Sequence, residues 1–77
     1  MAKESQYTDA YLKENRRRGR GKGLTIGSFL AYQLQGKARE YAGKYAAALE
    51  ASVIRRGAIV GKSIQGGVAY YPPEVSQ

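Results

Sequence analysis

The chain contains no cysteine and no histidine. Disulfides and zinc sites of the Cys/His type are therefore excluded. A Ser-His or Cys-His nucleophile cannot be assembled, so acid–base chemistry near neutral pH would need a carboxylate or a lysine with a strongly shifted pKa. Only six Asp and Glu residues are scattered over the 77 positions. The composition thus favours a binding protein over an enzyme, and we expect no catalytic residue, metal or cofactor.

Long apolar runs are also missing. No run approaches the roughly 18 residues of a membrane span, and the first seven residues lack the apolar centre of a secretion signal. We therefore expect a cytoplasmic protein without a membrane partner. A chain this short forms one small domain with a thin core, because it buries only about 60% of its unfolded surface.

Positive charge is what the sequence has in excess. Thirteen Lys and Arg against six Asp and Glu give a net charge of +7. Such an excess favours a polyanionic partner, and nucleic acid is the first candidate for that partner. Residues 1–23 carry +4 and residues 24–77 carry +3, so the charge is denser at the start. We interpret residues 1–23 as a basic N-terminal arm, 24–73 as the body and 74–77 as a tail.

Within the arm, a spacing of i, i+3, i+4 and i+7 predicts a short helix over residues 5–14. The spacing relates Tyr7, Ala10, Tyr11 and Glu14. A helix of this length is marginal by itself, so it either docks its tyrosines on the body or frays. Residues 15–23 hold three glycines and five cations. Glycine entropy and charge repulsion predict an extended, flexible linker there.

The body begins with two helical patterns. Apolar periodicity predicts a helix over 26–35 and a longer one over 37–56. Short β-branched runs on either side of Gly66-Gly67 predict a hairpin, which Pro72 ends. A hairpin must pack on the helices to be stable, and the apolar side chains available for this are Ile59, Val60, Ile64 and Val68.

Four tyrosines in the body have defined expected positions. Tyr41 and Tyr45 share the apolar face of the long helix, so we expect them in the core. Tyr70 and Tyr71 alternate along a strand, so we expect one to pack and the other to be exposed. An exposed ring can stack on an unpaired base, although packing is the role that we favour for tyrosine in a small domain.

Helices followed by a hairpin, on a small basic chain, resemble the winged helix-turn-helix family. The resemblance covers residues 24–73. Residues 49–60 look like a third helix that runs into a first wing strand, and residues 66–71 look like the wing tip and return strand. Small phage excisionases and plasmid regulators share this outline, although this chain lacks the tryptophan that many excisionases carry before the wing. The fold class expected is α+β, with two to three helices before a C-terminal β-hairpin.

The resemblance implies that the helix after the turn enters the major groove of DNA, while the wing lies on the backbone or minor groove. If residues 36–38 form the turn, the recognition helix starts with Lys37, Arg39, Glu40 and Lys44. Arg39 would then bind guanine, and Glu40 would accept a hydrogen bond from cytosine. The alternative is a solvated charged face.

Arg18-Gly19-Arg20 resembles the core of an AT-hook, with Gly21 in place of the usual proline. Extended arginines fit the narrow A·T minor groove. The alternatives are a nonspecific phosphate clamp, an RNA-binding arm or a solubilising tail. The cations concerned are Arg16, Arg17, Arg18, Arg20 and Lys22.

A third basic group comprises Arg55, Arg56 and Lys62. We expect these residues to cluster at the base of the wing and to anchor phosphates. Compensation of the helix dipole by Arg55 and Arg56 is compatible with that role.

The function predicted from the sequence is non-enzymatic DNA binding, as a transcriptional regulator or an architectural, excisionase-like factor. A homodimer on DNA is compatible with this prediction. The alternatives are an RNA- or ribonucleoprotein-binding module, and a small phage-type inhibitor that docks on a host protein.

Overall fold

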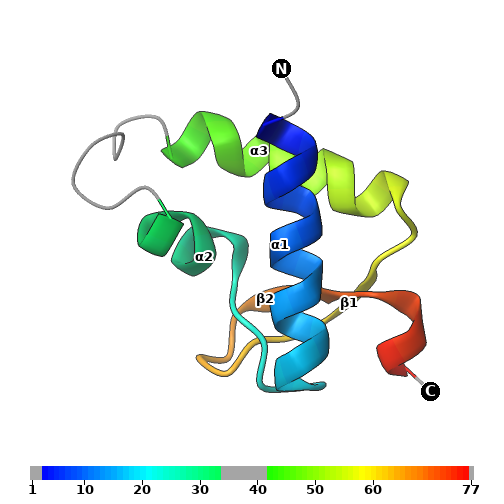
Figure 1. Ribbon diagram of the computed structural model, residues 1–77. Helices are drawn as coiled ribbons and strands as arrows, with labels where there is room; N and C mark the ends of the chain where they lie inside the picture. Colours follow the sequence, from blue (N-terminus) through cyan, green and yellow to red (C-terminus); the bar gives the residue numbers. More distant parts are fainter. Residues whose placement is uncertain (1–2, 34–41, 77) are drawn as a thin grey trace.

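The computed structural model describes residues 3–33 and 42–76 of the chain (Figure 1). The described elements are the helices α1 (Lys3–Arg18), α2 (Ile26–Gln33) and α3 (Ala42–Arg55), the strands β1 (Ile59–Lys62) and β2 (Val68–Tyr71), and the short 3₁₀ helix η2 (Pro73–Ser76). The predicted α+β class, with three helices before a C-terminal hairpin, is confirmed. The predicted helices over 26–35 and 37–56 correspond to α2 and α3, and residues 34–41 between them lie outside the described part.

The hairpin is an antiparallel pair that runs in register from Ile59 opposite Tyr71 to Lys62 opposite Val68. Its turn is also tied to the segment that precedes α2. The backbone N–H of Ile64 donates to the carbonyl of Gly23 at 2.8 Å, and Gly23 forms a bridge with Ser63. The loop between α1 and α2 is therefore held against the tip of the hairpin.

Helix α1 crosses α3 and covers β2 (Figure 1). The Tyr11 ring packs edge-on against Phe29, with the ring centroids 5.3 Å apart. The core takes side chains from all three helices and from β2, and consists of Tyr11, Leu12, Ile26, Phe29, Leu30, Leu49, Val53 and Tyr70. Of the two alternatives for the N-terminal helix, the docked one is confirmed, and the helix is longer than the predicted 5–14.

The extended linker predicted over residues 15–23 is wrong. Helix α1 continues to Arg18, and the next five residues form a tight turn in which Lys22 N–H donates to the Gly19 carbonyl at 3.0 Å. Gly19 and Gly21 take the left-handed φ values of 95° and 82° that this turn needs. Charge repulsion does not open the segment, because the Glu14 carboxylate binds two of its arginines. Residues 3–23 are thus part of the domain instead of a separate flexible arm.

Two α1 side chains take the place of a neighbouring strand along β2. The Tyr70 N–H donates to the Tyr11 hydroxyl at 3.1 Å, and the Tyr70 carbonyl accepts from Asn15 Nδ2 at 2.8 Å. The same two side chains hold Leu24, whose carbonyl accepts from the Tyr11 hydroxyl and from Asn15, and whose N–H donates to Asn15 Oδ1 at 2.9 Å. Tyr11 and Asn15 are fully buried. They satisfy backbone groups on both sides of α1 that would otherwise be buried without partners.

The tyrosine predictions are partly wrong. Tyr70 and Tyr71 are both buried, because the ring of Tyr71 lies over Gly61 and its hydroxyl reaches the glycine turn. Tyr45 is 41% exposed, and its ring lies 6.4 Å from that of Tyr7 instead of in the core. Tyr41 lies outside the described residues.

The hairpin packs through residues other than those expected. Ala69, Tyr70 and Tyr71 are the buried residues of β2. The four side chains predicted to face the helices are between 37% and 62% exposed: Ile59, Val60, Ile64 and Val68. That prediction is wrong because α1 packs on the hairpin. From the sequence, this helix was not assigned to the core, and it covers the buried residues of β2 instead of the four side chains named above.

Gly23 provides a test of this packing. A Cβ atom at Gly23 would stand 2.8 Å from Asn15 Cγ and 2.8 Å from the Tyr71 hydroxyl. Both groups are buried and hydrogen-bonded, so Gly23→Ala should lower the free energy of unfolding by about 2 kcal/mol in urea titration.

Gly43→Ala is the matched control for that substitution. A Cβ at Gly43 meets no heavy atom of the described residues within 4 Å, and Gly43 lies in the first turn of α3. The control should be neutral or stabilising by about 0.5 kcal/mol. Equal effects of the two substitutions would contradict the tight packing at Gly23.

Candidate nucleic-acid interface

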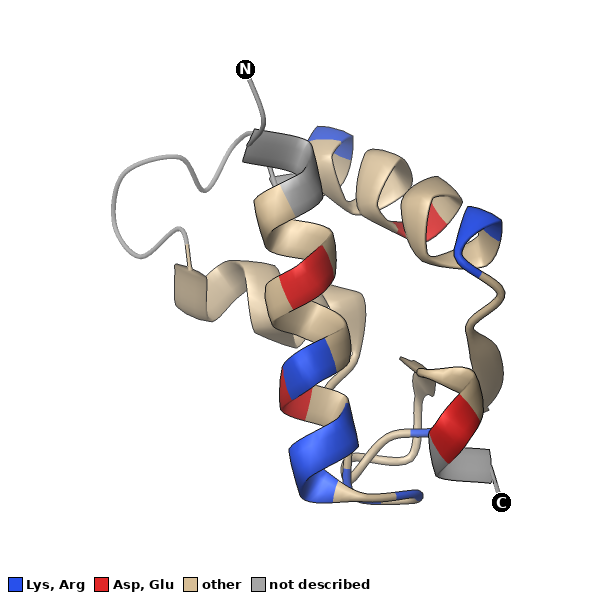
Figure 2. Cartoon of the chain, turned by 45° about the vertical axis from the view of Figure 1, so that its right-hand side comes forward, with Lys and Arg blue, Asp and Glu red and all other residues tan. Residues whose placement is uncertain are grey.

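Six cations gather where α1 ends, and we call this group the basic end: Arg16, Arg17, Arg18, Arg20, Lys22 and Lys62. The first three form the last turn of α1. Arg18 Nη1 donates to the Lys22 carbonyl at 3.4 Å, which closes the turn onto the helix. Figure 2 shows Lys and Arg gathered on the lower half of α1 and on the turn below it.

Tyr71 brings the end of β1 to the same place. Its hydroxyl accepts from the N–H groups of Gly21 and Gly23, at 3.1 and 2.9 Å, and donates to the carbonyl of Lys62 at 2.5 Å. One buried hydroxyl thus fixes the backbone from which three cations of the basic end project. The hairpin turn lies beside this end as well, through the bond between Ile64 and Gly23.

Ion pairs hold several of these guanidinium groups in place. Glu14 accepts from Arg17 and from Arg18, each at 2.8 Å, and the pKa of the Glu14 carboxyl is lowered by these two hydrogen bonds. Arg16 pairs with Glu74 at 2.7 Å. The side chains of Arg16 and Arg17 are still 54% and 70% exposed. Exposed pairs of this kind contribute at most about 1 kcal/mol, so a phosphate can compete for the arginines.

The AT-hook interpretation does not fit this conformation. An AT-hook needs an extended backbone, whereas Arg18 is helical and the N–H of Gly19 donates to the Asn15 carbonyl at 3.0 Å. Stabilisation of the negative end of the α1 dipole by cations accounts for part of this arrangement. The phosphate clamp, which was one of the three alternatives, is compatible with the compact turn and stays a prediction.

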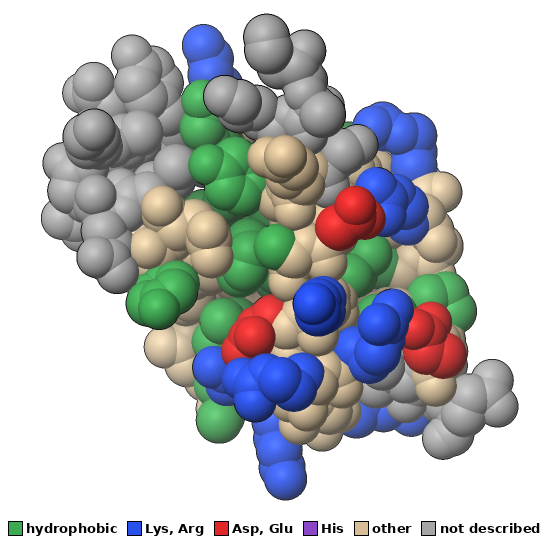
Figure 3. Space-filling model, viewed as in Figure 1, with side chains coloured by type: hydrophobic (Ala, Val, Ile, Leu, Met, Phe, Trp, Pro, Cys, Tyr) green, Lys and Arg blue, Asp and Glu red, His purple; other side chains and the backbone are tan. Residues whose placement is uncertain are grey.

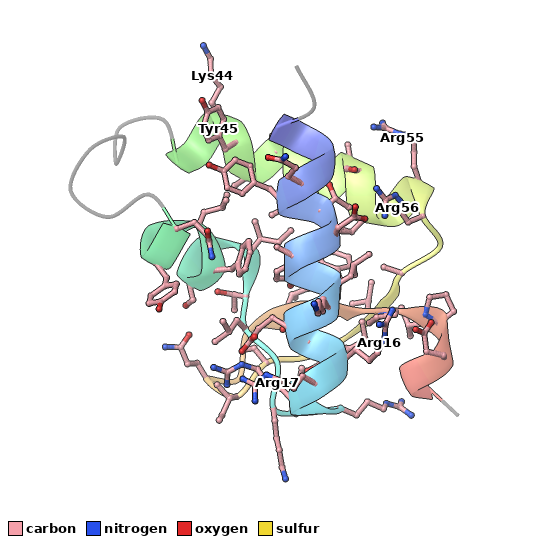
Figure 4. All side chains as sticks on the ribbon, viewed as in Figure 1. Arg16, Arg17, Lys44, Tyr45, Arg55 and Arg56 are labelled. Atoms are coloured by element: carbon pink, nitrogen blue, oxygen red, sulfur yellow. The ribbon has the colours of Figure 1, made fainter. Side chains whose placement is uncertain are left out.

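The third predicted group is divided between two places. Arg56 lies at the end of α3 and pairs with Asp9 of α1 at 2.5 Å, while Lys62 belongs to the basic end. Lys62 is the last paired residue before the hairpin turn, opposite Val68, whereas Arg55 and Arg56 precede the other end of β1. Figure 4 shows Arg55 and Arg56 at the end of α3, away from Arg17. The predicted cluster of Arg55, Arg56 and Lys62 is therefore wrong.

The described part of α3 carries little positive charge on its exposed face. Lys44 lies in its first turn, at the opposite end of the molecule from Arg17 (Figure 4). Ala47, Ala51 and Ile54 are exposed apolar residues on this helix. Glu50 accepts from the Tyr70 hydroxyl at 2.7 Å, and this hydrogen bond raises the pKa of Tyr70 to about 12. Lys37, Arg39 and Glu40, which were predicted to read bases, lie outside the described residues.

Lys13 is a candidate that the sequence reasoning missed. It is exposed on α1 and lines a shallow depression with Asp9, Arg16, Arg56 and Glu74. Figure 3 shows Lys and Arg side chains across this face of the molecule and around the lower end of α1. The spacing from Lys13 to Arg16 and Arg17, i+3 and i+4, would have placed all three on one face had the helix been extended past residue 14.

No helix in the described ranges is long and apolar enough to cross a membrane. Within the same ranges, no group of three or more Asp and Glu side chains is placed to hold a metal ion. Comparisons of the chain with protein-family models, with curated proteins and with solved structures found no match.

Proposed function

We propose that this protein is a non-enzymatic DNA-binding protein that holds the phosphate backbone of a duplex with its basic end. The observation that carries the proposal is the concentration of charge there. Six cations share the last turn of α1, the glycine turn and the end of β1, and Glu14 and Glu74 pair with three of them, Arg16, Arg17 and Arg18. Duplex DNA offers one negative charge per roughly 1.7 Å of its axis and releases counterions when cations bind it.

The fold supports this role because the cations project from a fixed backbone. Tyr71 binds the backbone of the turn from within the core, and Asn15 binds the backbone of Leu24 directly after it. The turn therefore loses little conformational freedom when it meets a phosphate, and the ordering cost of binding is low. The hairpin turn lies beside the basic end, so a wing and the glycine turn would meet the same stretch of DNA backbone.

Paired charge removals test the proposal. Arg20→Ala with Lys22→Ala should lower the affinity for a labelled duplex about tenfold in 0.1 M salt, and should reduce the slope of log K against log salt by about 1.8, because two phosphate contacts are lost. Fluorescence anisotropy over a salt series measures both quantities.

Lys44→Ala with Arg55→Ala is the matched control, since it removes the same charge from exposed positions elsewhere. It should change the affinity less than threefold, roughly the long-range effect expected at this ionic strength. Equal losses in the two pairs would refute the basic end as the contact. Structured RNA that outcompetes the duplex at the same salt would make RNA the partner instead.

A further inference from the structure

A groove between α1 and α2 adjoins the basic end. Its volume is about 690 Å³, which is within the range of roughly 300–1,000 Å³ typical of small-ligand sites. Glu14, Arg17 and Arg18 form one side of the groove, and residues of α2 form the other, with Leu24 between them. Two arginines of the basic end are thus also walls of this groove.

Tyr32 is the aromatic residue that stands at the edge of the groove. It lies in the last turn of α2 and is 68% exposed, the largest exposure of any large hydrophobic side chain in the described chain. Its neighbour Phe29, one turn earlier on the same side of α2, is buried in the core. The Tyr32 ring therefore contributes little to the core and offers an aromatic surface to a ligand. Aromatic rings of this kind stack on unpaired nucleobases, whatever the base.

The opposite wall supplies positive charge in a fixed position. Glu14 binds Arg17 through Nη2 and Arg18 through Nε, each at 2.8 Å. One carboxylate holds two guanidinium groups, so the wall keeps an excess of one positive charge. The Arg17 side chain is 70% exposed, and its other N–H groups remain open to a phosphate, for which the planar guanidinium is well suited.

We propose that this groove accepts one unpaired nucleobase, stacked on Tyr32, while Arg17 and Arg18 bind the adjoining phosphate. Gln33 also lines the groove, and its amide offers both a donor and an acceptor to a base edge. This inference rests on the proposed function and narrows it. The preferred ligand is a DNA duplex that carries an unpaired nucleotide, and not a perfectly paired one.

The test compares three duplexes: one with a single bulged thymidine, one with an abasic residue at the bulge, and one fully paired. The unmodified protein should bind the thymidine bulge about 5- to 100-fold more tightly than the abasic bulge, the range expected from stacking on one base. Tyr32→Ala and Tyr32→Leu should abolish this preference, and Tyr32→Phe should keep it. Tyr32→Leu keeps apolar bulk, so loss of the preference in that variant reports the aromatic ring.

Tyr45→Ala is the matched control, because Tyr45 is a partly exposed tyrosine that does not line the groove. It should leave the preference unchanged, and thermal unfolding followed by circular dichroism verifies that each variant is folded. Equal binding of the thymidine and abasic bulges by the unmodified protein, or a preference that survives Tyr32→Leu, would overturn the inference. Failure to bind any of the three duplexes would instead refute the proposed function.

Discussion

A chain that begins at Leu24 will not fold. Deleting residues 1–23 removes Tyr11 and Leu12 from the core and takes the partners from both the N–H and the carbonyl of Tyr70. Each buried polar group left without a partner costs about 1–3 kcal/mol. A domain of this size has a total stability of roughly 5 kcal/mol, so these losses together exceed what it has.

Circular dichroism during a urea titration checks this expectation. The truncated chain should show no cooperative transition, whereas the full chain should show one. A synthetic peptide of residues 1–23, added to the truncated chain, should restore helical signal, because the contacts that it makes are tertiary. A truncated chain with the same unfolding midpoint as the full protein would contradict the central position of α1. The deletion is consequently unsuitable for testing DNA contacts, which require the point variants described above.

The second large effect is expected at Asn15. This side chain is fully buried and makes hydrogen bonds to both backbone groups of Leu24 and to the Tyr70 carbonyl. Asn15→Asp keeps the shape but replaces the amide donor with a carboxylate that faces two carbonyl oxygens. We expect the free energy of unfolding to fall by about 3 kcal/mol or more near neutral pH.

The pH dependence of Asn15→Asp gives a further check. Burial beside carbonyl oxygens raises the pKa of the new carboxyl group, so its protonation favours the folded state. The deficit relative to the unmodified protein should therefore shrink as the pH falls through that raised pKa. Lys13→Ala, an exposed substitution two residues away on α1, should change stability by less than about 0.5 kcal/mol. A deficit at Asn15 as small as that at Lys13 would show that its hydrogen bonds contribute little.

The elements that could be predicted are those whose signal is local. The periodicity of 26–35 and 37–56 indicated α2 and α3, and Gly66-Gly67 between β-branched runs indicated the hairpin. The end of α1 could not be predicted in this way. Residues 15–18 contain no apolar side chain, and their helical state depends on Asn15 reaching Tyr70, 55 positions along the chain.

The candidate site could likewise be predicted only in part from local signals. Arg16, Arg17, Arg18, Arg20 and Lys22 were found from composition, because a dense run of cations is visible without a fold. Their compact arrangement was not predicted, since it depends on the hydroxyl of Tyr71, which lies far along the chain and accepts from the N–H groups of Gly21 and Gly23. Lys13 and Tyr32 were missed because each carries no signal until its helix has a position and a neighbour.

The amino-acid sequence by itself determined the excess of positive charge, the lack of Cys/His chemistry and the succession of helices and strands. These properties depend only on which residues are present and on how nearby residues are spaced. The tertiary structure alone decided that the N-terminal segment is part of the core, that Lys62 is separated from Arg55 and Arg56, and that a groove opens beside Tyr32. Those outcomes depend on which buried donors and acceptors meet across the chain, and spacing along the sequence does not encode that pairing in any local pattern.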